Sequence, residues 1–154
     1  MVREQRIAIF PGSFNPFTIG HKSVVDRALP LFDRIIVAIG TNAGKESADS
    51  DETARRIRKI AEIYADEPGV EVYSYEGLTV DFAVEMGARF ILRGVRTMQD
   101  FEYERMLADV NRRISGIETV LLYTLPEHAC VSSSVVRELE NYGVDVAGFL
   151  PGNE

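Results

Sequence analysis

"RIAIFPGSFNPFTIGHKSVV" (residues 6–25) joins a short apolar run to a helical pattern through an unusually irregular segment. Residues 6–10 are mostly apolar and include two isoleucines, which is typical of a buried strand. Residues 11–20 contain two prolines, two glycines, a serine, an asparagine and a threonine, and a helical pattern begins at His21. A strand, an irregular turn and a helix, in that order, form the repeating unit of an α/β fold.

The same alternation continues through the chain. The further predicted strands are 34–40, 70–75, 89–93 and 118–125. The predicted helices are 21–32, 51–66, 78–87, 100–115 and 132–141, and in the fourth of them Tyr103, Leu107, Val110 and Ile114 share one face. We therefore expect one Rossmann-like domain over residues 1–154, with a five-stranded parallel sheet and helices on both of its faces.

Composition excludes several classes of function. The formal net charge of −7 and the pI of about 4.9 argue against a broad basic surface that binds nucleic acid. Cys130 is the only cysteine, so neither an internal disulfide nor a cysteine-based metal site is expected, and Cys130 itself is predicted to be a buried small residue. Because no apolar run is long enough for a signal peptide or a membrane span, we expect a cytoplasmic protein without a membrane partner.

Polar residues follow each of the predicted strands. In a parallel sheet, ligands bind beyond the carboxyl ends of the strands, so this is where a site should be sought. The segments that follow the strands include Ser13 to His21, "TNAGKES" (41–47), "EGLT" (76–79), "RGVRT" (93–97) and "PEHACVSSS" (126–134). Since all of the strands are predicted to be parallel, these segments should meet at one edge of the sheet.

"GTNAGKES" (40–47) has some features of a phosphate-binding P-loop but lacks its spacing. Three residues instead of four separate the two glycines, and Glu46 follows Lys45 where a serine or threonine would be needed. No G-x-G-x-x-G is present either. Residues 41–53 contain no large apolar side chain, which predicts a mobile loop able to carry Lys45 over a ligand. The alternative is that Lys45 is a solvated surface side chain.

"TIGH" (18–21) lies at the predicted start of a helix. Thr18 and His21 are three residues apart, so both side chains can face one point, and Gly20 allows a ligand to approach the backbone. The helix N-terminus adds unpaired N–H groups and a partial positive charge. His21 can therefore donate a hydrogen bond to a phosphate oxygen, or carry a positive charge as negative charge develops. The alternative is that His21 only caps or packs the helix.

"VSSSVVRE" (131–138) repeats this pattern at another helix start. A serine before an apolar helical pattern is an N-cap signal, and capping alone is one explanation. The three serines 132–134 exceed what a cap needs, and Arg137 lies near the positive end of the helix dipole. Hydroxyls, backbone N–H groups and a guanidinium together predict a polyphosphate site.

Two arginines flank a glycine directly after the fourth predicted strand. Arg93 and Arg96, on either side of Gly94, suit a phosphate or a carboxylate. The alternative is that they pair with one of the carboxylates that follow, which are Asp100, Glu102 and Glu104.

These motifs resemble a known group of enzymes. "GSFNPFTIGH" together with "SSSVVR" resembles the nucleotidyltransferase superfamily, and "EGLTVDFA" with "RGVRTMQDFEYE" resembles its phosphopantetheine adenylyltransferase family, over residues 6–151. The resemblance implies transfer of the adenylyl group of ATP to 4'-phosphopantetheine by in-line attack, which gives dephospho-coenzyme A and pyrophosphate. It also implies Mg²⁺ that accompanies ATP without dedicated protein ligands, coenzyme A as a feedback inhibitor, and a homohexamer.

The resemblance also assigns site residues. His21, Lys45 and Arg93 would be catalytic, and Ser13, Lys45, Thr79 and Arg93 would bind 4'-phosphopantetheine. The residues that would bind ATP are Ser13, Phe14, His21, Gly94, Val95, Arg96, Glu104, His128, Ala129, Cys130, Val131, Ser132, Ser133 and Ser134.

The chain departs from the family pattern in places. Asn15 stands where the family usually has aspartate, and Ser13 replaces a frequent threonine. "ADSDETARR" (48–56) replaces the usual apolar start of the second helix, and the chain ends at "FLPGNE" without a further helix. Two alternative functions stay open. One is nucleotidyl transfer to nicotinamide mononucleotide or glycerol 3-phosphate, and the other is nucleotide binding without catalysis.

Overall fold

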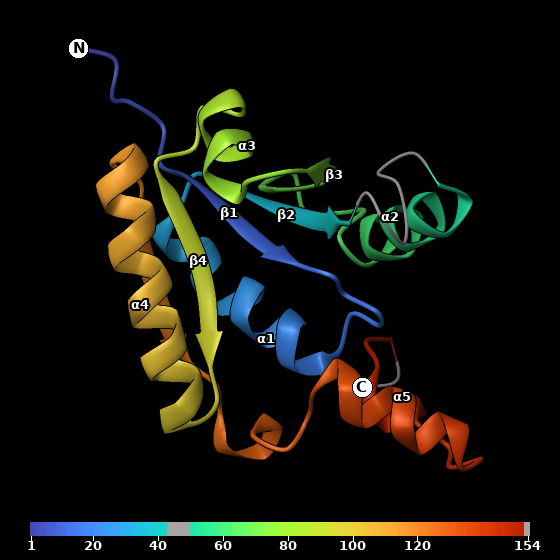
Figure 1. The fold of residues 1–154 in the computed structure, drawn as a ribbon. Helices are drawn as coiled ribbons and strands as arrows, with labels where there is room; N and C mark the ends of the chain where they lie inside the picture. The colour runs from blue at the N-terminus through green and yellow to red at the C-terminus, as the bar shows by residue number, and fades with distance from the viewer. Residues whose placement is uncertain (43–49, 153–154) are drawn as a thin grey trace.

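A computed structural model describes residues 1–42 and 50–152 and shows one five-stranded sheet (Figure 1). The strands are β1 (Ile7–Gly12), β2 (Arg34–Thr41), β3 (Val70–Glu76), β4 (Phe90–Val95) and β5 (Glu118–Tyr123). They lie in the order β3-β2-β1-β4-β5, and every neighbouring pair is parallel. The predicted parallel sheet is confirmed, and β1, which the opening stretch encodes, is its central strand.

The predicted helices are also confirmed, with ends that shift by a few residues. They are α1 (Ile19–Ala28), α2 (Asp51–Ile63), α3 (Thr79–Glu85), α4 (Met98–Ser115) and α5 (Ser133–Asn141). Short 3₁₀ turns η1 (Leu29–Leu31), η2 (Pro126–His128) and η3 (Ala147–Phe149) join or follow them. None of the helices in the described residues is long and apolar enough to cross a bilayer.

The sheet has a hydrophobic core on each side. Ala8 and Phe10 of β1 belong to one apolar cluster, which α1 and α2 cover. Ile7 and Ile9 point the other way, into a second cluster that includes residues of α3. Because successive residues of a strand face opposite sides, a run that is apolar at every position requires cover on both faces. The prediction of helices on both faces is therefore confirmed.

β4 and α1 approach each other closely at Gly94. A Cβ atom at this position would lie 3.0 Å from the Val24 Cγ2 atom, which is closer than side-chain contacts normally are. The absence of a side chain at residue 94 thus allows the carboxyl end of β4 to pack directly on the first turns of α1. The strand that carries Arg93 and the helix that carries His21 are held together at this point.

The apolar face of α4 is largely exposed, although apolar residues at helical spacing usually indicate a buried face. Tyr103, Val110 and Ile114 do share a face, but their exposed fractions are 56%, 50% and 59%. Met106 beside them is 55% exposed. Leu107 lies nearer the sheet and is partly buried, so the spacing locates the helix correctly but does not identify which apolar residues enter the core.

Lys45 and most of the predicted 41–53 loop lie outside the described residues, so its position over a ligand stays a prediction. The described part of this stretch begins again at Ser50, whose hydroxyl accepts a hydrogen bond from the Thr53 N–H and caps α2.

Candidate active site

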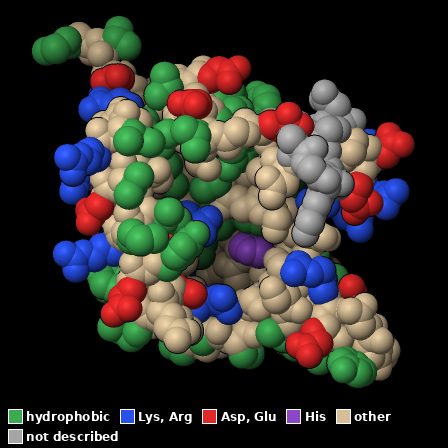
Figure 2. All heavy atoms as spheres, viewed as in Figure 1, with side chains coloured by type: hydrophobic (Ala, Val, Ile, Leu, Met, Phe, Trp, Pro, Cys, Tyr) green, Lys and Arg blue, Asp and Glu red, His purple; other side chains and the backbone are tan. Residues whose placement is uncertain are grey.

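A cleft of about 430 Å³ lies at the carboxyl ends of β1 and β4, and residues at the N-terminus of α5 also line it. Figure 2 shows it as a hollow with a histidine side chain on its floor and Lys or Arg side chains around it. The predicted site residues that line this cleft are Ser13, Phe14, His21, Arg93, Gly94, Arg96, Glu104, Val131, Ser132, Ser133 and Ser134. The segments after β1 and β4 and before α5 thus meet, as their positions in the sequence predict.

His21 is both a cap of α1 and part of the cleft wall. The Thr18 backbone N–H donates to His21 Nδ1 over 2.9 Å, and the Thr18 hydroxyl accepts from the His21 backbone N–H. Since Nδ1 accepts a hydrogen bond, the proton of the neutral ring resides on Nε2. The two explanations considered for His21 therefore do not compete: one ring nitrogen caps the helix, and the other is left as a donor for a ligand.

The surroundings of His21 keep its ring neutral. The rings of Phe14 and Phe17 lie with their centroids 5.0 and 5.4 Å from that of His21. Burial among these rings, followed by the positive charges of Arg93 and Arg96, lowers the pKa of His21 from 6.5 to about 4. In the free protein at neutral pH, His21 is thus a neutral hydrogen-bond donor, and the positive charge at the site comes from the arginines.

This low pKa makes stability depend on pH. As the pH falls below 6.5, the unfolded chain takes up the His21 proton before the folded chain does. The free energy of unfolding should therefore fall by on the order of 3 kcal/mol as the pH is lowered from 6.5 to about 4. Above pH 6.5, His21 should not make the free energy of unfolding depend on pH. Urea unfolding at about pH 7 and about pH 4.5 measures this loss, and His21→Gln is the control that should lose less stability. Equal losses in both proteins would contradict the assignment.

Phe14 packs its ring against that of His21. Its backbone has a φ of 48°, which is uncommon for a residue with a side chain, and its ring is only 3% exposed. Gly12 makes room for this ring, because a Cβ atom there would lie 2.9 Å from Phe14 Cζ. The side chain therefore packs against His21 and the core, and contact between Phe14 and ATP stays a prediction.

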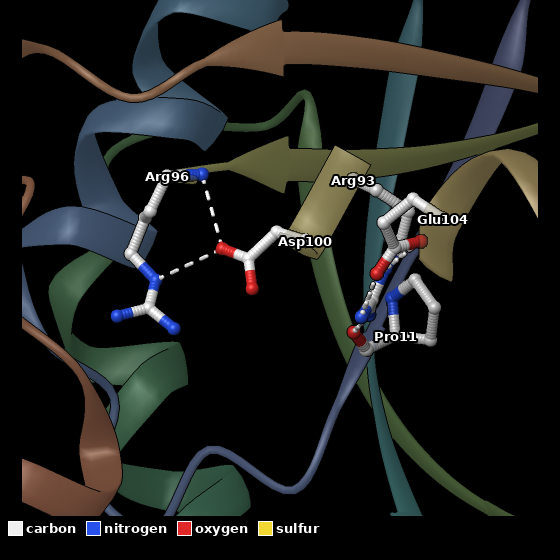
Figure 3. A network of polar contacts seen from close by, with 5 residues as sticks. All are labelled: Pro11, Arg93, Arg96, Asp100 and Glu104. Carbon is white, nitrogen blue, oxygen red and sulfur yellow. Dashed lines mark hydrogen bonds and ion pairs between the residues drawn. The ribbon is translucent and has the colours of Figure 1, made fainter. Parts of the chain in front are cut away.

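Arg93 is held by a carboxylate on α4, as Figure 3 shows. Its Nε atom donates to both Glu104 oxygens over 2.9 and 3.0 Å, and its Nη2 atom donates to Oε1 over 2.7 Å. Arg93 Nη1 also donates to the Pro11 carbonyl over 2.7 Å. Glu104 is 5% exposed, so it is a buried charge whose partner is this arginine. The predicted alternative of ion pairing is correct for Arg93, and it fixes this side chain at the cleft.

Arg96 pairs more loosely with Asp100. Its backbone N–H donates to Asp100 Oδ2 over 3.1 Å, and its Nε atom lies 3.6 Å from the same oxygen (Figure 3). Both side chains line the cleft. Because only one end of the guanidinium is engaged, Arg96 keeps N–H groups that can bind an anion.

The serine run connects α5 to the loop after β1. Ser132 caps α5 by accepting from the Val135 N–H over 3.2 Å, while the Ser133 hydroxyl donates to the Pro16 carbonyl over 2.7 Å. Arg137 donates to the Asn15 carbonyl and to the Ser134 hydroxyl. The two segments that sequence reasoning assigned to phosphate binding thus form one wall of the cleft.

A second cavity of about 260 Å³ lies on the α3 and α4 side of the sheet. Ser13, Thr79 and Arg93 all line it, which brings together the described residues predicted to bind the second substrate. Ser13 and Arg93 also line the first cleft. The two cavities therefore meet at the carboxyl ends of β1 and β4.

The remaining predicted ATP-binding residues are not among those that line the first cleft. Val95 is 6% exposed, and its side chain belongs to the interior. His128 and Ala129 lie in and directly after η2. The expectation that Cys130 is buried was wrong, because this residue lies in the exposed turn between η2 and α5. Contacts of these four residues with ATP stay predictions.

Sequence reasoning missed the role of Arg56. Its Nη1 atom reaches from α2 to the Ser13 carbonyl over 3.1 Å, so α2 and α5 both hold the loop after β1. Arg56 lies in a run of charged residues that is typical of a solvated helix, and no local pattern distinguishes it from its neighbours.

The described residues do not supply a metal cage. No group of three or more His, Cys, Asp or Glu side chains in residues 1–42 and 50–152 is arranged to hold a metal ion. Mg²⁺ usually keeps several waters and binds through one or two carboxylates together with substrate phosphates, so a nucleotide in the cleft would supply oxygens for such an ion.

Comparisons with known proteins agree with this geometry. Residues 9–139 match the family described as cytidylyltransferase-like. The chain is 51% identical to a phosphopantetheine adenylyltransferase of Bacteroides fragilis over 146 residues, which cover 95% of this chain and 96% of that one. It is 53% identical to the phosphopantetheine adenylyltransferase of Bacteroides thetaiotaomicron, with 95% of each chain covered.

A solved structure shows the same fold at much lower identity. A bifunctional NMN adenylyltransferase/ADP ribose pyrophosphatase from Francisella tularensis superposes with a TM-score of 0.69 and 15% identity, over 98% of this chain and 46% of that one. At this identity the likeness establishes the fold and does not choose the acceptor. The family follows instead from the relatives at about half identity: the chain belongs to the phosphopantetheine adenylyltransferase family of nucleotidyltransferases.

Proposed function

We propose that this enzyme transfers the adenylyl group of ATP to 4'-phosphopantetheine and releases dephospho-coenzyme A and pyrophosphate. The observation that carries the proposal is the junction of two cavities, of about 430 and 260 Å³, at Ser13 and Arg93. A direct transfer between two substrates requires two adjoining sites, so that the reacting atoms of the two bound substrates can meet. The names of the relatives at about half identity give phosphopantetheine as the acceptor and an adenylyl group as what is transferred.

The reaction needs positioning and charge stabilisation more than covalent chemistry. An oxygen of the acceptor phosphate would attack the α-phosphorus of ATP while the bond from that phosphorus to the bridging β-phosphate oxygen breaks. Pyrophosphate would leave with the electron pair. Because a phosphate monoester is largely ionised at neutral pH, the attacking oxygen needs no general base.

Each wall of the cleft has a role in this proposal. His21 Nε2–H would donate to the α-phosphate as charge develops, and Arg93 and Ser13 would hold the acceptor phosphate. The N-terminus of α5, with the serines and Arg137, would hold the β- and γ-phosphates. Lys45 would join the acceptor side. Mg²⁺ would be held by the phosphates of ATP and would supply further charge neutralisation there.

Pyrophosphate release with different acceptors tests the proposal. The protein is incubated with ATP, Mg²⁺ and, in turn, 4'-phosphopantetheine, nicotinamide mononucleotide or glycerol 3-phosphate, with CTP replacing ATP for the last. Release with 4'-phosphopantetheine alone is the expected result. Release with another acceptor would assign the enzyme to a different transfer, and ATP binding without release for any acceptor would show a non-catalytic binding protein.

We also propose that the chain assembles into a homohexamer through α4. Tyr103, Met106, Val110 and Ile114 form an exposed apolar stripe on this helix, which supports an interface. A charged side chain in such an interface is costly, so Val110→Glu should reduce the molar mass measured by light scattering to that of a smaller species. Glu118→Gln, at the exposed start of β5, is the control. An unchanged mass for Val110→Glu would exclude the stripe as an interface.

Two further parts of the proposal concern the cell. Dephospho-coenzyme A as the product makes coenzyme A, its phosphorylated relative, a candidate feedback inhibitor of the same two cavities. A cytoplasmic location, where ATP and the acceptor are present together, completes the proposal. No nucleic acid and no membrane take part in it.

A further inference from the structure

We propose that Tyr75 is a positioning residue for the acceptor substrate, because its hydroxyl fixes that of Thr79 so that the pair offers one O–H to a carbonyl of the pantetheine arm. This inference rests on the proposed function and extends it to a residue outside the family motifs described above.

Tyr75 and Thr79 meet at the wall of the second cavity. Tyr75 lies near the end of β3 and Thr79 is the first residue of α3. Their hydroxyl oxygens are 2.7 Å apart, which is a short hydrogen bond between two neutral groups. Both residues line the cavity of about 260 Å³ that Ser13 and Arg93 reach from the first cleft. The hydroxyl pair therefore lies in the space assigned to the acceptor.

Neighbouring residues fix both the ring and the backbone of Tyr75. It stacks on the Phe82 ring with centroids 4.8 Å apart and an interplanar angle of 11°, and Phe82 is itself buried. Gly40, its partner across the β2–β3 pair, leaves the space that the hydroxyl end occupies, since a Cβ atom there would lie 3.2 Å from Tyr75 Oη. The Thr41 hydroxyl donates to the Tyr75 carbonyl over 3.2 Å. Tyr75 can therefore hold Thr79 in one position without help from a ligand.

The number of hydrogens in the pair determines what it can bind. Two hydroxyls carry two hydrogens, and one hydrogen is used in the bond between them. Whichever residue donates, one O–H remains for a ligand acceptor. The rest of the lining is mixed: Ile91, Leu107 and Ala108 are apolar, while Asn111 and Thr119 add further polar groups. A cavity with apolar walls and a few hydrogen-bonding groups matches a chain of methylene groups and amides, which is the chemistry of a pantetheine arm.

Tyr75→Phe tests the proposal, because it removes the hydroxyl and keeps the ring stacked on Phe82. We expect the KM for 4'-phosphopantetheine to rise about fivefold, the scale of one neutral hydrogen bond, while kcat and the KM for ATP stay within about twofold. Tyr73→Phe is the matched control. Tyr73 lies on the same strand, is 39% exposed, and its hydroxyl donates to Glu71 outside the cavity. This variant should match the wild type.

A double-mutant cycle separates positioning from general stability. If the two hydroxyls act as one unit, Tyr75→Phe should add little to the rise in KM caused by Thr79→Val. An unchanged KM for the acceptor in Tyr75→Phe would overturn the inference, and so would an equal loss with both substrates. The wild type assayed alongside tests the proposed function separately. If it shows no turnover with 4'-phosphopantetheine, the failure lies in the proposed function, and the assignment of the acceptor cavity falls with it.

Discussion

His21→Ala should lower kcat by at least about 10²-fold, the scale of losing one preorganised donor to a developing charge. The Nδ1 atom of His21 is occupied by the Thr18 N–H, so the ring can offer only its Nε2–H to a ligand. This donor costs no reorganisation during the reaction, because the helix cap has already fixed the ring and its tautomer. Steady-state kinetics at saturating ATP and acceptor measure the effect on kcat.

The control must separate catalysis from helix capping. The alanine variant also loses a helix cap, which costs about 1 kcal/mol of stability. Its melting curve should therefore show that the variant is folded at the assay temperature. Lys22→Ala changes the next residue of α1, which pairs with Asp26, and should keep nearly full activity. A decrease in kcat of less than about threefold in a folded His21→Ala protein would exclude His21 as the main stabiliser of the α-phosphate.

Glu104→Ala should destabilise the protein by about 3 kcal/mol and also impair turnover. Removing this carboxylate leaves the Arg93 guanidinium without the partner that accepts from both Nε and Nη2. The cost is large because the space that the buried Glu104 side chain filled is left empty, and the Arg93 guanidinium, whose side chain is 31% exposed, loses its carboxylate partner. Chemical denaturation measures the loss of stability, and kcat/KM for each substrate measures the functional loss.

A paired replacement separates the two effects. Arg93→Met together with Glu104→Leu removes both charges and should recover much of the stability, because apolar residues of similar volume can replace a buried ion pair. The activity should not recover, since Arg93 lines both cavities. If the free energy of unfolding of Glu104→Ala lies within about 1 kcal/mol of the wild-type value, the ion pair is not required for stability.

The sequence allowed the sheet and its helices to be predicted because their signals are local. Four-residue apolar runs such as that at the start of β1 have the length of a strand, and the glycine- and proline-rich segments mark where each strand ends. The placement of the site followed from topology, since parallel strands bring their carboxyl ends to one edge. Neither step required knowledge of a distant contact.

The parts that could not be predicted depend on contacts between distant segments. Whether Arg93 would pair with Glu104 or stay free depended on how α4 docks against β4. The pKa of His21 follows from burial beside the Phe14 and Phe17 rings and from two arginines, which only the folded chain brings together. Whether the apolar stripe of α4 would be buried or exposed could not be predicted either. Apolar residues at helical spacing form the same pattern whether they pack on the core of their own chain or on a second chain.

The contact between Gly94 and Val24 has a mechanical consequence. With no side chain between them, the end of β4 and the start of α1 pack directly on each other, and a methyl group at residue 94 would lie 3.0 Å from Val24 Cγ2 and require one of them to shift. We therefore expect His21 and the two arginines at the end of β4, Arg93 and Arg96, to keep their spacing when the substrates bind. Adjustment to the substrates would then fall to the surrounding segments, and the sheet would set the geometry of the reacting centre before binding.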